Sequence, residues 1–378
     1  MMQIQRGKKY YIYKIIQTII SVCYHRPLGF IELCSNVNKY CVHESYFPEF
    51  PQKSKIKILW EQFVATIRYG YPNKYYFPYG FDVKSNKEMA EYIHYMTFAQ
   101  IRDDLNQFSM HNSTYLLRNK LAFGIFTSGF GINSGNNIAL LHDEGVFIIS
   151  DKRNVSVEEF MTRYPSDYFV KLIDGECGCG IFQLKIEEDG TFLINGSKSS
   201  IEQLNQLIKG GRYIVQAKIK QHVEMNRLYP HSINTIRLVT IRNVRTNKVE
   251  VFPSILRMGA NGSFVDNTSL GGLAVGVDLE TGGLFEYGYY KPEFGTRTTE
   301  HPNTKVSFSE FVIPYIQEAK EQAIFLHAML PELYSIGWDI AISENGPIFI
   351  EGNDNWEING PQICNGGLKN IFYHNMKF

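Results

Sequence analysis

The sequence lacks an excess of charge of either sign. Its 378 residues include 38 Lys and Arg and 38 Asp and Glu, which gives a formal net charge of +0. A neutral chain has no long-range field that would collect nucleic acid or an anionic membrane surface. Nucleic acid is therefore not an expected partner, and any anionic ligand must be bound by a local group of cations.

The sequence also lacks the paired cysteines of disulfide frameworks and structural metal sites. None of its six cysteines forms a C-x-x-C pair: Cys23, Cys34, Cys41, Cys177, Cys179 and Cys364. In a chain of this length, such spacing indicates reduced thiols and predicts a cytoplasmic protein.

No hydrophobic run is long enough to span a membrane. The most apolar run, YYIYKIIQTIISVCYH at residues 10–25, has only about 15 residues, contains Lys14 and lacks a small-residue cleavage site. Arg6, Lys8 and Lys9 precede it. Two interpretations stay open, a core helix and an amphipathic helix on a membrane surface.

Two common nucleotide-binding motifs are absent as well. No G-x-x-x-x-G-K-[ST] occurs, and GFGINSG at residues 129–135 lacks the G-x-G-x-x-G spacing. A phosphate site, if present, must therefore belong to an architecture other than a P-loop or a Rossmann fold.

The length of the chain and the change from helical to β-rich runs along it predict more than one domain. A single core rarely grows past roughly 250 residues. Up to about residue 112 the sequence contains two helical runs, 55–69 and 86–105, and the aromatic loop YGYPNKYYFPYGFD. Many short β-rich runs follow, such as DYFVKLI, RYIVQAKI and NTIRLVTI, with few helices between them. Because parallel strands need crossover helices, we expect antiparallel sheets and the α+β class.

The stretch GWDIAISENGPIFIEGN, residues 337–353, predicts a β-hairpin. We expect a three-residue ENG loop, Glu344–Gly346, in which the glycine takes the left-handed position. This register sets three pairs opposite each other: Ser343 with Pro347, Ala341 with Phe349, and Asp339 with Glu351. The alternation of side chains then places Ile340, Ile342, Ile348 and Ile350 on one face, and Asp339, Glu351 and Asn353 on the other.

The polar face of this hairpin predicts a metal site. Two carboxylates that face each other at close range repel, unless a cation lies between them. Oxygen donors without nearby His or Cys suit Mg²⁺, which takes few protein ligands and keeps water or phosphate oxygens. The alternative is a solvated hairpin face on which acids meet by chance.

Candidates for phosphate binding lie elsewhere in the chain. DYFVKLIDGECGCGIFQLKI places Lys171 on a strand and follows it with Gly175, Gly178 and Gly180, whose flexible backbone can turn N–H groups toward an anion. Glycine-rich hairpins without such a role are equally common. Three more cations stand within apolar runs, where each can be functional or salt-bridged: Lys120, Arg237 and Arg257.

Together these residues resemble a known family. Lys120 before a helix, Lys171 with its glycine-rich hairpin, RYIVQAKI, and the terminal oxygen donors occur in the order used by ATP-grasp enzymes. More narrowly, HSINTIRLVTI, GSFVDNTSLGG, HPNT and GWDIAISENGPIFIEGN are similar to the sugar-transfer-associated ATP-grasp family found with polysaccharide and capsule gene sets. The resemblance runs from about residue 112 to the C-terminus.

The resemblance implies an ATP-grasp fold, in which two α+β lobes with antiparallel sheets sandwich ATP, after a mostly helical N-terminal region. The implied domains are residues 1–111, a candidate substrate-binding part, an N-terminal lobe at 112–225, and a C-terminal lobe with a magnesium site at 226–378.

The resemblance also implies roles for individual residues. Lys120 and Lys171 would contact the α and β phosphates of ATP, under a loop that contains Gly175, Gly178 and Gly180. Gln216, Lys218 and Ile219 would lie at the adenine or ribose, although many relatives carry an acid where this chain has Gln216 and Ala217. Asp339, Glu351 and Asn353 would hold Mg²⁺, and the γ phosphate and acyl-phosphate would meet the catalytic set of Arg237, Arg257 and Asn267.

The implied reaction is an ATP-dependent carboxylate–amine ligation through an acyl-phosphate. The partners would be a uronic-acid sugar or glycan carboxylate and an amino acid or another amine. A membrane-surface helix at residues 10–25 would suit a lipid-linked glycan. A kinase-like phosphotransferase that acts on a sugar and a non-catalytic nucleotide-binding protein are the alternatives. The chain contains no G-x-S-x-G or H-E-x-x-H, which agrees with catalysis by positioning and charge neutralisation.

Overall fold

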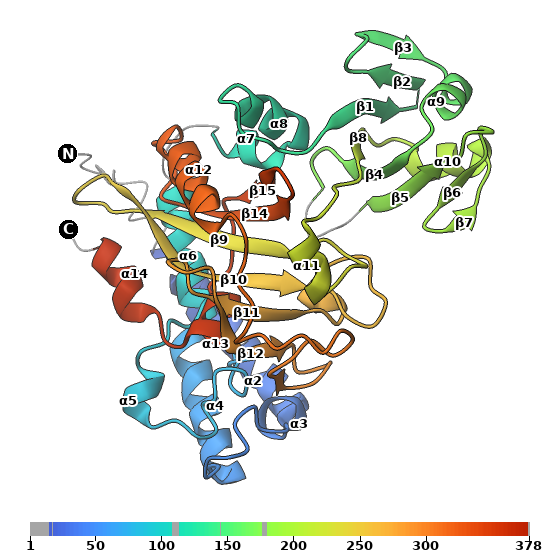
Figure 1. The fold of residues 1–378 in the computed structure, drawn as a ribbon. Helices are drawn as coiled ribbons and strands as arrows, with labels where there is room; N and C mark the ends of the chain where they lie inside the picture. Colours follow the sequence, from blue (N-terminus) through green and yellow to red (C-terminus); the bar gives the residue numbers. More distant parts are fainter. Residues whose placement is uncertain (1–14, 17, 108–112, 144, 176–179, 377–378) are drawn as a thin grey trace.

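The computed structural model describes residues 15–16, 18–107, 113–143, 145–175 and 180–376. It contains a helical N-terminal region, a smaller lobe built on an eight-stranded sheet, and a larger lobe built on a seven-stranded sheet (Figure 1). Within each sheet the neighbouring strands are antiparallel. The predicted α+β class with two antiparallel sheets is confirmed.

The N-terminal region consists of helices that pack around buried aromatic side chains. The predicted helix at 55–69 is confirmed as α4, whereas the run at 86–105 divides into two helices. The break occurs because the Ile93 N–H donates to Gln362 Oε1 (2.8 Å) instead of continuing a helix. Tyr75, Tyr76 and Tyr79 of the aromatic loop are buried in this core. The helices are η1 (Ser21–His25), α2 (Arg26–Ser35), α3 (Val37–Cys41), α4 (Lys55–Tyr69), α5 (Asn86–Met89) and α6 (Tyr95–Gln107).

The sheet of the smaller lobe has one covered face and one face toward the larger lobe. Tyr168 and Val170 of β4 pack with the helices α9 and α10, and the alternate residues Phe169 and Lys171 point the other way. The strand order is β3-β2-β1-β8-β4-β5-β6-β7. The bounds are β1 (Asn137–His142), β2 (Gly145–Ile148), β3 (Arg153–Val155), α9 (Val157–Arg163), β4 (Asp167–Leu172), β5 (Ile181–Ile186), β6 (Phe192–Ile194), β7 (Ser197–Lys198), α10 (Ile201–Ile208) and β8 (Tyr213–Ala217).

The sheet of the larger lobe is covered on both faces. On β9, Ile236 and Leu238 join a core with α12, while Val239 and Ile241 pack on the opposite face with α6 and α14. The strand order is β13-β12-β11-β10-β9-β14-β15. The bounds are α11 (Val223–Leu228), β9 (Thr235–Arg242), β10 (Val249–Met258), η2 (Thr268–Leu270), β11 (Leu273–Val277), β12 (Leu284–Tyr290), β13 (Arg297–Thr298), α12 (Ile316–Ala328), β14 (Ser335–Ser343), β15 (Gly346–Asn353), α13 (Asn359–Asn365) and α14 (Lys369–Met376).

Two short helices connect the lobes. They are α7 (Thr114–Arg118) and α8 (Lys120–Ser128), and their Leu117 and Phe123 side chains are buried in the core of the larger lobe. The Lys120 N–H, at the start of α8, donates to Ile173 O of the smaller lobe (2.9 Å). This bond fixes the distance between the α8 N-terminus and the loop after β4. The domain boundaries at 112 and 226 stay predictions.

The hairpin β14–β15 forms, but its turn differs from the prediction. The loop has two residues, Glu344 and Asn345, so Ser343 lies opposite Gly346 and Ala341 opposite Ile348. Contacts outside the hairpin hold this turn, because Glu344 accepts from the Val223 N–H (2.7 Å).

A register shift between Asp339 and Ile340 then restores the predicted pairing of Asp339 with Glu351. The predicted four-isoleucine face is wrong. Ile340 and Ile342 enter the large core with Phe349, while Ile348 faces the other side of the sheet.

No helix in the described part of the chain is long and apolar enough to cross a membrane. Much of the predicted apolar segment at residues 10–25 lies outside the described residues.

Candidate active site

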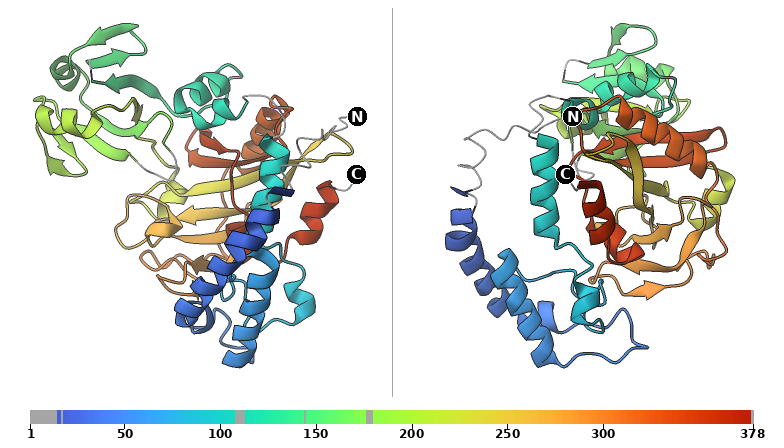
Figure 2. Two further views of the ribbon diagram at one scale, coloured as in Figure 1. Left: turned by 180° about the vertical axis from the view of Figure 1, so that it is seen from behind. Right: turned by 90° about the vertical axis from the view of Figure 1, so that its left-hand side faces the viewer.

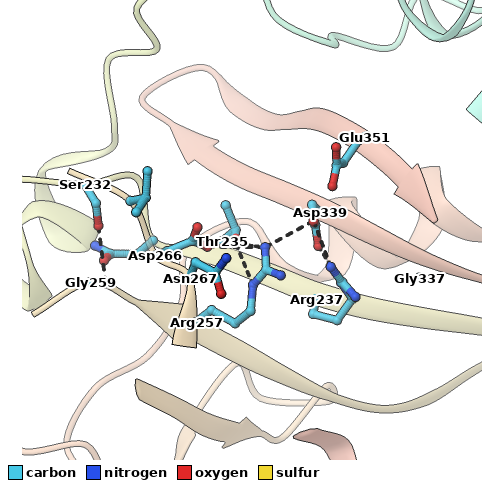
Figure 3. A network of polar contacts seen from close by, with 12 residues as sticks. Ser232, Thr235, Arg237, Arg257, Gly259, Asp266, Asn267, Gly337, Asp339 and Glu351 are labelled. Carbon is cyan, nitrogen blue, oxygen red and sulfur yellow. Dashed lines mark hydrogen bonds and ion pairs between the residues drawn. The ribbon is translucent and has the colours of Figure 1, made fainter. Parts of the chain in front are cut away.

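A carboxylate held by two arginines forms the centre of the site. Asp339 of β14 is 3% exposed and lies opposite Arg237 of β9. Arg237 donates from Nε to Asp339 Oδ1 (2.5 Å) and from an Nη atom to Oδ2 (2.9 Å). Arg257 of β10 reaches the same Oδ2 at 3.1 Å. Three adjacent strands thus present one charged cluster on a single face of the sheet (Figure 3).

A second layer of polar groups holds Arg257. Its guanidinium donates to the Thr235 hydroxyl (2.8 Å) and lies 3.3 Å from Asp266 Oδ2, and Thr235 also donates to Asp266. Burial alone lowers the pKa of Arg257, but the nearby carboxylates of Asp266, Asp339 and Glu351 raise it above its ordinary value. The guanidinium therefore remains charged within the fold.

The two facing carboxylates differ in their electrostatic environments. Burial would raise the pKa of Asp339, but the guanidinium groups of Arg237 and Arg257 outweigh that effect and hold its pKa well below the usual range. Burial raises the pKa of Glu351, and the charge of Asp339 raises it further. Asn353 is the side chain that donates to Glu351 Oε1 (3.3 Å). Of the two carboxylates, Glu351 is therefore the one whose ionised form a bound cation would stabilise more.

The donor set fits a hard divalent cation in part. Asp339 and Glu351 face each other, as predicted, and Asn353 lies two residues further along β15. The described residues hold no group of three His, Cys, Asp or Glu side chains arranged around a metal. Two carboxylates and one amide oxygen suffice for Mg²⁺, which usually completes its shell with water and phosphate oxygens.

Lysines on the other side of the site come from the smaller lobe and from α8. Burial lowers the pKa of Lys171 to about 8, Glu351 and Asp266 partly offset this, and the charge of Lys120 adds to it. The charges of Glu351 and Asp266 therefore act on Lys171 from the larger lobe, and that of Lys120 from the start of α8. Lys120 Nζ donates to Gly175 O (2.6 Å), at the start of the glycine-rich loop.

The glycine-rich loop is described only at its two ends. Gly180 has φ +68°, a left-handed conformation that favours glycine, and its carbonyl accepts from the Leu172 N–H (3.3 Å). Gly178 lies outside the described residues. The predicted fold of the loop over phosphates stays a prediction.

A cavity of about 620 Å³ lies between the lobes. Phe169 of β4 and Gln183 of β5 line it from the smaller lobe, and Ser232 and Phe264 line it from the larger. The predicted adenine-contacting residues Lys218 and Ile219 belong to its wall. Its wall combines the two aromatic rings with polar and charged side chains such as Asp167 and Gln183, a mixture that suits a flat heterocycle with polar edges.

The other predicted residues have partners that define their positions. Gln216 Nε2 donates to Asn137 Oδ1 (2.7 Å), and the Lys218 N–H donates to Asp167 O (3.0 Å). Both groups therefore form hydrogen bonds with strands of the smaller lobe. The Asn267 side chain accepts from the Ser269 N–H (2.8 Å) and begins the short helix η2. Figure 3 shows Asn267 beside Arg257.

Sequence reasoning missed Thr235, Asp266 and Phe169. The first two had a signal, because Thr235 precedes Arg237 by two residues on one strand face and Asp266 directly precedes Asn267 in GSFVDNTSLGG. Asp354, which follows the predicted ligands, is 3% exposed and forms an ion pair with Arg118 (2.7 Å).

Comparison with solved structures finds distant similarity. An N5-carboxyaminoimidazole synthetase from Staphylococcus aureus complexed with ADP is 12% identical, with a TM-score of 0.35 over 67% of this chain and 50% of that chain. D-Alanine-D-alanine ligases from Helicobacter pylori and Bacillus anthracis are 11% and 9% identical, with TM-scores of 0.39 and 0.38. The match covers 67% of each of these two ligases, and 73% and 70% of this chain. The chain spans about half the length of the synthetases it matches.

No curated protein matches this chain. A family model described as sugar-transfer associated ATP-grasp matches residues 101–374, which is well over half of the sequence. The two antiparallel sheets, the charged cluster between them and this match agree. The chain belongs to the sugar-transfer associated ATP-grasp family.

Proposed function

We propose that the protein is an ATP-dependent carboxylate–amine ligase that acts on a uronic-acid sugar or a polysaccharide precursor. A substrate carboxylate would attack the γ phosphorus of ATP, and an amine would then displace phosphate from the acyl-phosphate to give an amide, ADP and phosphate. The observation that carries the proposal is the buried charged cluster of the larger lobe, in which Arg237 and Arg257 hold Asp339 opposite Glu351.

Each member of the cluster has a separate task in this proposal. Lys171 and Lys120 neutralise phosphate oxygens from the side of the smaller lobe. Arg237 and Arg257 stand on rigid strands with fixed hydrogen bonds, so their donors are organised before an anionic acyl-phosphate arrives. Asn267 lies beside Arg257 and would contact the same anion.

Asp339, Glu351 and Asn353 would hold the magnesium ion. The bound ion would supply positive charge at the β and γ phosphates. The raised pKa of Glu351, caused by burial and by Asp339, supports this assignment, because a cation at that position removes both penalties.

The adenine would occupy the cavity beside Lys218 and Ile219. Its volume of about 620 Å³ and its wall residue Phe169 suit a stacked purine. This part of the proposal predicts that a bulky, charged change in the wall, Phe169→Glu, weakens ATP binding without a direct effect on the carboxylate substrate.

The test is a turnover assay with ATP, Mg²⁺ and pairs of uronic acids and amines. Ligation releases phosphate and ADP only when both substrates are present, and mass spectrometry finds an amide. Glu351→Gln should abolish phosphate release, whereas the matched control Glu188→Gln, an exposed site on the smaller lobe, should not. Unchanged turnover in Glu351→Gln would remove the magnesium assignment.

A sugar phosphotransferase is the second candidate, since the same cluster would neutralise a γ phosphate in transfer to a hydroxyl. A phosphorylated sugar and ADP, formed without amine and without release of phosphate, would identify that reaction. ATP binding without turnover under any of these conditions would favour a non-catalytic nucleotide-binding protein.

A further inference from the structure

The N-terminal helices expose a continuous apolar face on the outside of the molecule. Nearly half of the exposed large hydrophobic side chains of the described residues lie on residues 15–31 and 56–67. The part on α2 and α4, here the α2–α4 face, consists of Leu28, Ile31, Ile56, Leu59, Trp60, Phe63, Val64 and Ile67. Monomeric soluble proteins rarely leave so large a contiguous apolar surface without a function.

Helix α4 turns its larger apolar stripe outward. The exposed residues of this stripe recur at spacings of three and four, from Ile56 to Ile67, and so share one side of the helix. The opposite side, buried against the protein, carries Ile58 but also the polar Gln62 and Thr66. The inward side is therefore the more polar of the two, which is the reverse of an ordinary surface helix.

The two helices form one surface. The Phe30 ring of α2 lies 5.1 Å from the Phe63 ring of α4, which in turn stacks on Trp60 at 5.7 Å. Figure 2 shows the pair side by side at the outer edge of the molecule, away from both sheets. The surface is thus formed by two helices packed side by side, and it is not a groove that would bind a peptide.

The charges at the edge of this face are basic. Lys55, Lys57 and Arg68 of α4 are all exposed. They lie at the two ends of the helix, so they flank the apolar stripe. In sequence, the chain that leads to these helices adds the cations of Arg6 and Lys8.

The acids of the two helices are already neutralised within the chain. Glu61 lies 2.9 Å from Lys53, and Glu32 accepts from the Tyr40 hydroxyl (2.9 Å) and lies 3.5 Å from Lys39. A second copy of this face would therefore bring cations against cations at both ends of α4. An anionic surface has no such conflict.

We propose that the α2–α4 face docks on the surface of an anionic lipid bilayer. The aliphatic side chains and the Trp60 and Phe63 rings would enter the headgroup region, and Lys55, Lys57 and Arg68 would pair with lipid phosphates. The contact is peripheral, with both helices in the plane of the membrane. It is independent of the chemistry proposed for the cleft between the lobes.

Trp60 gives this inference a direct reporter. The protein contains three tryptophans, of which Trp338 and Trp356 are 0% and 1% exposed and Trp60 is 62% exposed. A blue shift of tryptophan emission on addition of lipid therefore reports on Trp60. With the full-length protein and vesicles of phosphatidylcholine containing 30% phosphatidylglycerol, we expect such a shift and quenching by brominated acyl chains.

The variants separate the apolar contribution from the charge. Ile56→Gln with Phe63→Gln should weaken cosedimentation with these vesicles by about tenfold or more. Lys55→Gln with Lys57→Gln should weaken it by roughly fivefold per charge at low salt, since each cation near an anionic surface adds on the order of 1 kcal/mol. The matched control is Ile125→Gln with Leu207→Gln, two exposed apolar residues of α8 and α10, which should bind like the parent protein.

Three results would overturn the proposal. One is equal binding of the parent and the Ile56→Gln, Phe63→Gln variant. Another is an unshifted Trp60 emission in the presence of anionic vesicles. The third is concentration-dependent dimerisation without lipid, abolished by the same variant, which would assign the face to a second copy of the chain. If the double variant fails to fold by circular dichroism, the Trp60 emission and quenching of the parent protein decide alone.

Discussion

Neutralisation of the two facing carboxylates of the site should affect the stability of the protein differently. Asp339 is 3% exposed and is held by Arg237 and Arg257, whose side chains are 17% and 21% exposed. Asp339→Asn leaves these guanidinium groups without their shared partner. Removal of one member of a buried ion pair costs about 3–5 kcal/mol, and we expect the lower value because Arg257 keeps Asp266.

Glu351→Gln should leave the stability unchanged or increase it. Burial and the charge of Asp339 raise the pKa of Glu351 in the folded protein above the unfolded value. Its ionised form therefore destabilises the fold at neutral pH, where the unfolded chain also carries the charge. Glutamine keeps the shape and removes the charge, so without metal the penalty disappears.

These effects translate into measurable melting temperatures. Unfolding entropy of about 2.1 cal/mol/K per residue gives roughly 0.8 kcal/mol/K for the whole chain, so about 3 kcal/mol lowers the Tm by about 4 °C. Differential scanning calorimetry at pH 7 with EDTA should show this loss for Asp339→Asn and none for Glu351→Gln. Equal losses in both variants would refute the electrostatic distinction between the two carboxylates.

The pH dependence provides a second check on Asp339. Its folded pKa is lowered, so its contribution is fully present above the unfolded carboxyl pKa of about 4 and is lost as pH falls toward the folded value. The difference in Tm between the parent and Asp339→Asn should therefore shrink as the pH falls below 4.

Three more predictions concern the surroundings of the cluster. At pH 8.5, where Lys171 with its pKa of about 8 is mostly neutral, calorimetry should detect uptake of more than about half a proton when ATP binds, and none in Lys171→Met. Gly337→Ala would place a Cβ 2.7 Å from Trp356 Cβ and 3.2 Å from Arg237 Cδ, so it should cost about 1–3 kcal/mol in thermal unfolding and lower phosphate release. Arg257→Lys retains the charge but loses the planar fork of donors. It should lower the rate of phosphate release by about tenfold or more, while its Tm stays within roughly 4 °C of that of the parent protein.

The sequence predicted the class of fold because that depends on local periodicity. Alternation along β4 separates Tyr168 and Val170 from Phe169 and Lys171 without reference to any other segment. The break between α5 and α6 was missed, because it depends on the side chain of Gln362, which lies far away in the sequence. Propensity carries no information about such a partner.

The site was predicted only in part, as the fold was. Asp339 and Glu351 lie opposite each other as predicted, because both belong to one hairpin. The partner of Asp339 was not predicted: the sequence suggested a cation between two acids, and the structure shows two guanidinium groups on one of them. Pairing of β9 with β14 is a long-range choice that alternation within each strand does not encode.

The agreement at Asp339 and Glu351 results from two departures that cancel. The loop is one residue shorter than predicted, which moves every later pair by one position, and the register shift beside Ile340 moves the remaining pairs back. An unbulged hairpin with this turn would place Ile350 opposite Asp339 and turn Glu351 to the core face, where its charge has no partner. The bulge therefore keeps both carboxylates on the face that bears Arg237 and Arg257, and a bulge in this position is the kind of irregularity that proteins retain beside active sites.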